Sequence, residues 1–405
     1  MTFFKLFFIF LITENIYQKY IPGLNYFDEI ITIFAGYLLI SSSKVKELWW
    51  KYCLKILSCI FIIVIIGIFA TAYYKIQPEF GGIWRDAFAI IKFPVCYCGL
   101  LLYMNKYDKG KVQKSVLGFC KFYICVLFVF GIYNFVFYTP WLSNGIRYGF
   151  PLYSFLYTHN TFLIIAVLSM LAVLLSDNMQ RNKIYIILGL SVLVLTFRSK
   201  AFIPIIFIVF AYLWIKRERK IKHQKIKILL GVLIIAVVAL YFSSGRIDEY
   251  VSYGDTSARG AFYIYGLDVA SKYFPTGSGF CTFASTLSAE YYSPLYYDYG
   301  MNYIYGLTED DHSYAGDVFW PNIYAQYGYI GLVSYLLMIW FFLKSLFSRY
   351  RIFSTQWIGS VAIFLYSISA AFAESFYTND SGVITAVVLA MYLGNDNFLM
   401  KKVKV

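Results

Sequence analysis

Charged residues are scarce in this chain. Only 14% of its 405 residues are Asp, Glu, Lys or Arg, whereas 60% are hydrophobic; a typical globular domain has about 25% charged residues. A soluble protein of this size could not bury so much apolar surface. Apolar runs close to the ~20 residues that span a bilayer recur along the whole chain. The composition therefore excludes a soluble enzyme, a secreted scaffold and a DNA-binding module, and it predicts a polytopic membrane protein.

Several common chemical motifs are also missing. Six of the seven cysteines lie in apolar runs, where Cys acts as a small hydrophobe, and only Cys281 falls in a long polar connection. No CxxC or zinc spacing, Walker A loop, nucleophile elbow, HExxH or dinucleotide fingerprint is present. We therefore expect no metal and no cofactor, and any phosphate energy must arrive on the substrate.

The net charge of +13 does not indicate a nucleic-acid partner. The basic residues form short clusters between apolar runs, and every other connection is rich in them, as in cytoplasmic loops of membrane proteins. This pattern predicts a multi-pass protein of the cytoplasmic (cell inner) membrane with both termini in the cytoplasm. We expect an all-α fold of about twelve transmembrane helices, over residues 3–20, 24–41, 53–74, 87–104, 115–138, 157–176, 184–197, 200–215, 228–243, 320–343, 357–376 and 381–398.

The connection between the ninth and tenth predicted helices is exceptionally long and acidic. Residues 244–318 carry ten acids against three bases, together with thirteen tyrosines. Long loops are commonly functional. We expect three parts: helices 1–9 in residues 1–243, an external substrate-binding and catalytic loop in 244–318, and helices 10–12 with a short basic tail in 319–405. Residues 262–273 could form an amphipathic helix in the loop. The tyrosines of 291–305 suit sugar faces or, alternatively, an aromatic belt at the membrane interface.

A charged residue beside an apolar span is costly in a membrane and therefore indicates a structural or functional role. Arg198 and Lys200 lie between two predicted helices at their external mouth. They could hold an anionic phosphate group, or they could be snorkelling anchors at helix ends. Arg147, in the loop 141–153, could join them or remain a solvated base.

Arg259 is one of only three bases in the acidic loop. It is a candidate for anion binding, and an ion pair with Asp255 or Asp268 is the structural alternative. The segment 275–279, Pro-Thr-Gly-Ser-Gly, could make a backbone nest for an anion or an ordinary turn.

His312 stands beside three acidic residues where the loop returns to the membrane. An imidazole next to carboxylates is a plausible general base, with Asp311 as its neighbour; a solvated loop histidine is equally open. His159, at an outer helix mouth, has a structural role in this interpretation.

Taken in order, these segments resemble the O-antigen ligase/polymerase superfamily. Thr196–Arg198 is similar to the Thr-x-Arg of that family. Ser257–Arg259 followed by Pro275–Phe280 resembles its "R…P-x-G-x-G-x" segment, and His312–Ser313 followed by Ile323–Leu332 resembles "H-[NS]…E-x-G-x-x-G". The resemblance covers residues 190–335.

The resemblance implies a glycosyltransferase that acts outside the cytoplasmic membrane on undecaprenyl-diphosphate-linked glycans. It implies that Arg198 and Arg259 bind the donor's diphosphate, with Lys200 and Arg147 beside them, and that His312 or Asp311 activates the acceptor hydroxyl. Gln326 departs from the pattern, because the ligases usually have Glu there.

Lys200 and the stretch 317–320 are closer to the polymerases than to the ligases. We therefore expect a Wzy-type polymerase, which joins lipid-linked repeat units into O-antigen or capsule-type polysaccharide, and the resemblance implies a chain-length regulator as partner. The alternative is an O-antigen ligase that transfers the glycan to lipid A-core. A flippase for the same lipid-linked sugar is a third hypothesis, although no internal repeat typical of transporters is present.

Overall fold

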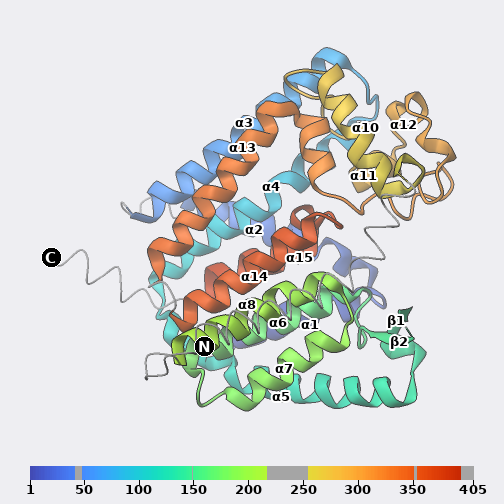
Figure 1. The fold of residues 1–405 in the computed structure, drawn as a ribbon. Helices are drawn as coiled ribbons and strands as arrows, with labels where there is room; N and C mark the ends of the chain where they lie inside the picture. The colour runs from blue at the N-terminus through green and yellow to red at the C-terminus, as the bar shows by residue number, and fades with distance from the viewer. Residues whose placement is uncertain (42–47, 148, 217–253, 351–353, 394–405) are drawn as a thin grey trace.

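The computed structural model describes residues 1–41, 48–147, 149–216, 254–350 and 354–393, and the regular secondary structure in these ranges is helical apart from one β-hairpin (Figure 1). The ninth predicted span, 228–243, lies outside them. The other predicted spans each coincide with a helix. The elements are α1 (Thr2–Gln18), α2 (Phe27–Ser41), α3 (Leu48–Tyr74), α4 (Phe80–Tyr103), α5 (Lys109–Phe137), β1 (Ser143–Arg147), β2 (Phe150–Tyr153), α6 (Asn160–Asn178), α7 (Lys183–Leu195), α8 (Ser199–Lys216), α10 (Ala258–Lys272), α11 (Thr286–Glu290), α12 (Pro294–Asp298), α13 (Trp320–Arg349), α14 (Thr355–Ala371) and α15 (Asp380–Val387), which continues as a wider turn to Tyr392.

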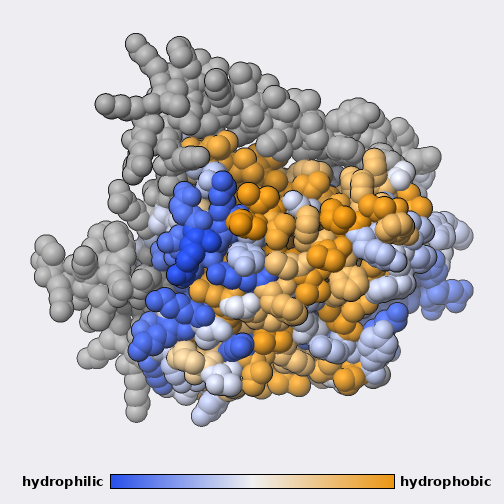
Figure 2. Space-filling model, turned by 90° about the horizontal axis from the view of Figure 1, so that it is seen from below, coloured by the Kyte–Doolittle hydropathy of each residue, from blue (hydrophilic) through white to orange (hydrophobic). Residues whose placement is uncertain are grey.

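Six of the described helices are long and apolar enough to cross a membrane. Figure 2 shows a broad hydrophobic band across the middle of one face, with hydrophilic residues toward its left and right edges. Such a band between two polar ends is typical of helices that cross a bilayer. The chain is therefore a helical, multi-pass membrane protein. The six spans are Gly23–Ser41, Tyr52–Tyr74, Phe80–Tyr103, Lys109–Phe137, Asn160–Asn178 and Trp320–Ser348.

The helices pack closely where small residues face each other. A Cβ on Gly99 of α4 would lie 2.1 Å from the Ala35 carbonyl oxygen of α2, and one on Gly359 of α14 would lie 2.9 Å from Ala172 of α6. Helix association in lipid depends on such close backbone approach, because no hydrophobic effect drives it there.

A buried ion cluster also joins α2 to α4. The Lys92 ammonium lies 2.6 Å from a carboxylate oxygen of Asp28 and 2.5 Å from one of Glu29. The Lys92 and Asp28 side chains are 8% and 5% exposed. We call these three residues the Lys92 cluster.

Residues 254–318 form an ordered unit with a hydrophobic core of its own. Helix α10 includes the helix predicted over 262–273 and packs on α13, and Figure 1 places α10, α11 and α12 together at one end of the bundle. Phe262, Phe283 and Tyr296 are fully buried in this core. The tyrosines of this unit lie in two environments: Tyr296 is buried in the core, whereas Tyr303 is 87% exposed.

The turn at 275–279 docks into a break in α13. Gly328 has φ +63° and interrupts the helix, and the carbonyls of Ala325 and Gln326 accept hydrogen bonds from the N–H groups of Ser278 and Gly279 at 2.9 Å each. A Cβ on Gly328 would lie 2.1 Å from the Pro275 carbonyl oxygen. Of the two alternatives for this segment, the structure shows the ordinary turn, because neighbouring backbone carbonyls accept from the N–H groups of Ser278 and Gly279.

The residues after this turn are held by polar side chains of three helices, and two of these side chains, Asp86 and Gln326, are buried. The N–H groups of Phe280, Cys281 and Thr282 donate to Thr71, Asp86 and Gln326 at 2.9, 2.8 and 3.0 Å, respectively. The amide of Gln326 therefore fixes the external unit on the bundle.

Candidate functional site

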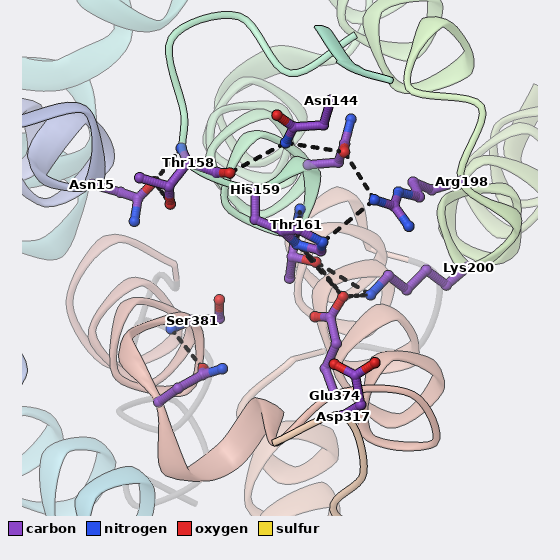
Figure 3. A network of polar contacts seen from close by, with 12 residues as sticks. Asn15, Asn144, Thr158, His159, Thr161, Arg198, Lys200, Asp317, Glu374 and Ser381 are labelled. Atoms are coloured by element: carbon purple, nitrogen blue, oxygen red, sulfur yellow. Dashed lines mark hydrogen bonds and ion pairs between the residues drawn. The ribbon is translucent and has the colours of Figure 1, made fainter. Parts of the chain in front are cut away.

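Three cations from two distant parts of the chain gather at the end of the bundle that carries the external unit. We call Arg198, Lys200 and Arg259, with Glu374, Asp317 and His159, the cation cluster. Figure 3 shows Arg198 and Lys200 pointing toward His159 and Glu374, with Asp317 directly beneath Glu374. Lys200 also lies within electrostatic reach of Arg198, Arg259 and Asp317. The structure therefore brings together three of the four cations that the sequence singled out.

A tight turn between α7 and α8 delivers two of these cations. Phe197 adopts φ +46°, a left-handed conformation that is uncommon for a residue with a side chain. Its ring is stacked on Phe150 of the hairpin, with centroids 5.0 Å apart. Aromatic packing thus holds a strained turn and orients the residues on both sides of Phe197.

Arg198 binds the first residues of α6. Its Nη2 donates to Asn160 Oδ1 at 3.0 Å and lies 3.3 Å from His159 Nε2. His159 Nδ1 accepts from the Thr161 backbone N–H at 3.3 Å and faces Thr161 Oγ1 at 3.0 Å. Burial, and then the charges of Arg198, Lys200 and Arg259, lower the pKa of His159 to about 3. His159 is therefore neutral at physiological pH.

Lys200 is paired with a carboxylate from the connection between α14 and α15. Its ammonium donates to Glu374 Oε1 and, at 3.2 Å, to Thr161 Oγ1, and the Thr161 hydroxyl in turn donates to Glu374 Oε1 at 2.5 Å. The Lys200 and Glu374 side chains are only 13% and 14% exposed. Glu374 thus receives hydrogen bonds from two donors in a largely dry environment.

Arg259 enters from the start of α10, where Ser257 caps the helix by accepting from the Gly260 N–H at 3.2 Å. Its Nη2 lies 2.7 Å from Asp317 Oδ2. The structure thus pairs Arg259 with an acid other than Asp255 or Asp268, because the chain returns from the external unit to α13 beside α10 and brings Asp317 to Arg259.

Tyr263 lies one helical turn after Arg259 and links α10 to the connection between α14 and α15. Its hydroxyl donates to the Phe372 carbonyl at 3.0 Å, two residues before Glu374. Burial raises the pKa of Tyr263 to about 12, against the opposing charge of Arg259. The phenol is therefore a neutral donor that ties α10 to the segment carrying Glu374.

The remaining predicted residues lie outside this network. His312 is half-buried in an exposed turn, where its Nδ1 lies 3.3 Å from the Glu309 carbonyl oxygen, and Asp311 accepts from the Ser313 N–H at 3.2 Å. Arg147 is the last residue of β1. Asn144, in the same strand, donates to the Thr158 carbonyl oxygen at 3.2 Å, next to the cation cluster. None of the hydrogen bonds described for His312 or Asp311 reaches the cation cluster.

Sequence reasoning missed Glu374 and gave His159 only a structural role. A signal for Glu374 was present, because Glu374 and Asp380 are the only charged residues between 355 and 393. An isolated acid at the end of an apolar span indicates a buried partner. In the sequence, acids were weighed only in the loop 244–318, so Glu374 was not paired with Lys200.

The chemistry of the gathered side chains suits an anionic ligand. Among the described residues, Arg198, Lys200 and Arg259 lie together with Glu374, Asp317 and a neutral His159. Guanidinium groups bind phosphate oxygens in a fork, and an ammonium adds a point charge. Within the described ranges, no three His, Cys, Asp or Glu side chains gather as metal ligands would. No family model matches this chain, and no curated protein matches it.

Proposed function

We propose that this protein is a glycosyltransferase that polymerises undecaprenyl-diphosphate-linked oligosaccharide repeat units at the outer face of the cytoplasmic membrane. The donor's anomeric carbon is transferred to a hydroxyl of an acceptor chain, and undecaprenyl diphosphate leaves. The product is an O-antigen or capsule-type polysaccharide.

One observation carries the proposal: three basic side chains, two of them guanidinium groups, gather at the end of an apolar helix bundle. A lipid-linked diphosphate is anionic at one end and apolar over the rest of its length, so it matches both surroundings. As the glycosidic bond breaks, negative charge develops on the diphosphate. Cations already fixed in a poorly solvated site stabilise that charge without reorganising.

The proposal includes a finer topology. About twelve helices span the membrane, both termini lie in the cytoplasm, and the connection 244–318 is external. Residues 1–243 and 319–405 form the membrane part. The basic clusters of alternate connections support this orientation. A chain-length regulator is the proposed protein partner, and membrane lipid surrounds the helices.

The direct test is incubation of the purified protein with undecaprenyl-diphosphate-linked repeat units alone, followed by a gel of the lipid-linked products. We expect a ladder spaced by one repeat, which Arg198→Ala abolishes. If no ladder forms but glycan moves onto added lipid A-core, the protein is a ligase. If neither reaction occurs and the substrate crosses the bilayer of proteoliposomes, the protein is a flippase.

A further inference from the structure

Two of the cations of the proposed diphosphate site already have carboxylate partners in the free protein. Lys200 is bound to Glu374, and Arg259 is bound to Asp317. A diphosphate diester with two negative charges therefore competes with carboxylates for its ligands. The outcome of this competition differs between the two pairs.

Lys200 cannot hold a diphosphate while keeping all its present bonds. An ammonium has three N–H groups, and Lys200 donates to both Glu374 and Thr161. Two phosphate oxygens would require it to release at least one of these acceptors. A guanidinium has five N–H groups in a fork and can bridge two anions, so Arg259 can keep Asp317.

Glu374 remains oriented when the ammonium turns away. The Thr161 hydroxyl still donates to Glu374 Oε1 at 2.5 Å, and the neutral His159 ring lies next to Thr161, with Nδ1 3.8 Å from the same oxygen. A buried carboxylate that loses its cation becomes a stronger base, because burial disfavours its charged form.

We infer that Glu374 is the general base of the proposed glycosyl transfer, and that the donor diphosphate activates it by drawing Lys200 away. This inference rests on the proposed function. Glu374 shares Lys200 with the diphosphate, and the anomeric carbon is separated from the diphosphate by a single oxygen. An acceptor hydroxyl that attacks this carbon therefore lies next to Glu374.

The step balances in atoms and charge. The acceptor oxygen forms a bond to the anomeric carbon, and the bond from that carbon to the phosphate oxygen breaks. Undecaprenyl diphosphate departs with the electron pair, held by Lys200, Arg198 and Arg259. The hydroxyl proton passes to Glu374, which returns it to solvent when the product leaves.

The test uses the full-length protein in detergent with lipid-linked repeat units as substrate and undecaprenyl diphosphate as binding probe. In Glu374→Gln, we expect kcat to fall by about 10²–10⁴-fold, as is usual for a lost general base. Binding of undecaprenyl diphosphate should be retained or become tighter, because a competing carboxylate is gone. Formate should restore part of the rate in Glu374→Ala, and Glu374→Asp should keep more activity than Glu374→Gln.

Glu290→Gln is the matched control. Glu290 also pairs with an arginine of the same end of the bundle, Arg85, at 2.6 Å, but both side chains are about half exposed. We expect its kcat to be close to wild type. Full kcat in Glu374→Gln would overturn the inference, and so would joint loss of rate and diphosphate binding without formate rescue, which indicates a structural role. Absence of both binding and a ladder in the wild-type protein would instead overturn the proposed function.

Discussion

Two groups of charged side chains lie in this bundle, and they differ in the balance of their charges. In the Lys92 cluster, one ammonium faces two carboxylates, and the Lys92–Asp28 pair is more than nine-tenths buried. Among the described residues of the cation cluster, three cations lie with two carboxylates next to the external unit. Carboxylates therefore outnumber the cation in the first group, whereas cations outnumber carboxylates in the second.

The comparison separates structural charges from functional ones. Both groups contain cations beside apolar spans, which is the only property visible in the sequence. The Lys92 cluster joins two neighbouring helices, α2 and α4. The cation cluster draws on α8, α10 and four connections, as a ligand site does. The sign of the prevailing charge and the number of contributing elements therefore distinguish the two groups.

The largest expected effect is on stability, in the Lys92 cluster. Lys92→Met leaves Asp28 and Glu29 buried without their cation, and loss of one partner of a buried ion pair costs about 3–5 kcal/mol. We expect a marked fall in the thermal midpoint in detergent. Arg259→Ala should change it little, since Arg259 and Asp317 are partly exposed. Equal destabilisation by the two substitutions would contradict the distinction between structural charges in the Lys92 cluster and functional charges in the cation cluster.

The next largest effect is on activity, in the cation cluster. Arg259→Ala removes a preorganised positive charge from the leaving group, and losing one such stabiliser typically costs about 10²–10³-fold in kcat. Polymer ladders and initial rates measure this loss. The matched substitution Arg85→Ala removes an exposed, paired arginine of the same end and should leave the rate within about twofold. A similar loss in both variants would show that general electrostatics, rather than the site, is responsible.

The sequence predicted the helices and the cations but not how they meet. Long apolar runs determine helices locally, so the all-α class and most spans could be read directly. The contact between Arg259 and Asp317 depends on α10 packing over α13, and the docking of 275–279 depends on the break at Gly328. Neither follows from periodicity. The choice of His312 over Glu374 as base came from weighing the acidic loop and not the isolated acid of an apolar span.

A third prediction concerns the docked turn, which holds the external unit and with it Arg259. Gly328→Ala forces a Cβ to within 2.1 Å of the Pro275 carbonyl oxygen at φ +63°, so we expect destabilisation of about 1–3 kcal/mol and weaker diphosphate binding. Gly118→Ala in α5 is the control, because its Cβ meets nothing within 4 Å. We expect limited proteolysis to cut the external unit of Gly328→Ala faster than that of wild type. The helices that carry the Lys92 cluster should remain uncut in both proteins. Proteolytic resistance equal to wild type would refute the docking role.

The smallest expected effect is a pH dependence centred on His159. Its charged neighbours are Arg198, Lys200, Arg259 and Glu374, and burial together with the three cations keeps its pKa near 3 in the folded protein, against about 6.5 when unfolded. The unfolded chain therefore binds the proton first, and the folded state loses stability as pH falls from about 6.5 toward 3.

Since 44% of the His159 side chain is exposed, we expect a loss of only about 1 kcal/mol between pH 7 and 5. Thermal unfolding of wild type and His159→Gln at both pH values measures this difference. The variant should lose less stability than wild type, because it has no proton to gain at this position. Identical pH dependence in the two proteins would mean that neither burial nor the three cations disfavours a proton on His159. The dry, positively charged environment that suits an anionic ligand would then be absent from the cation cluster.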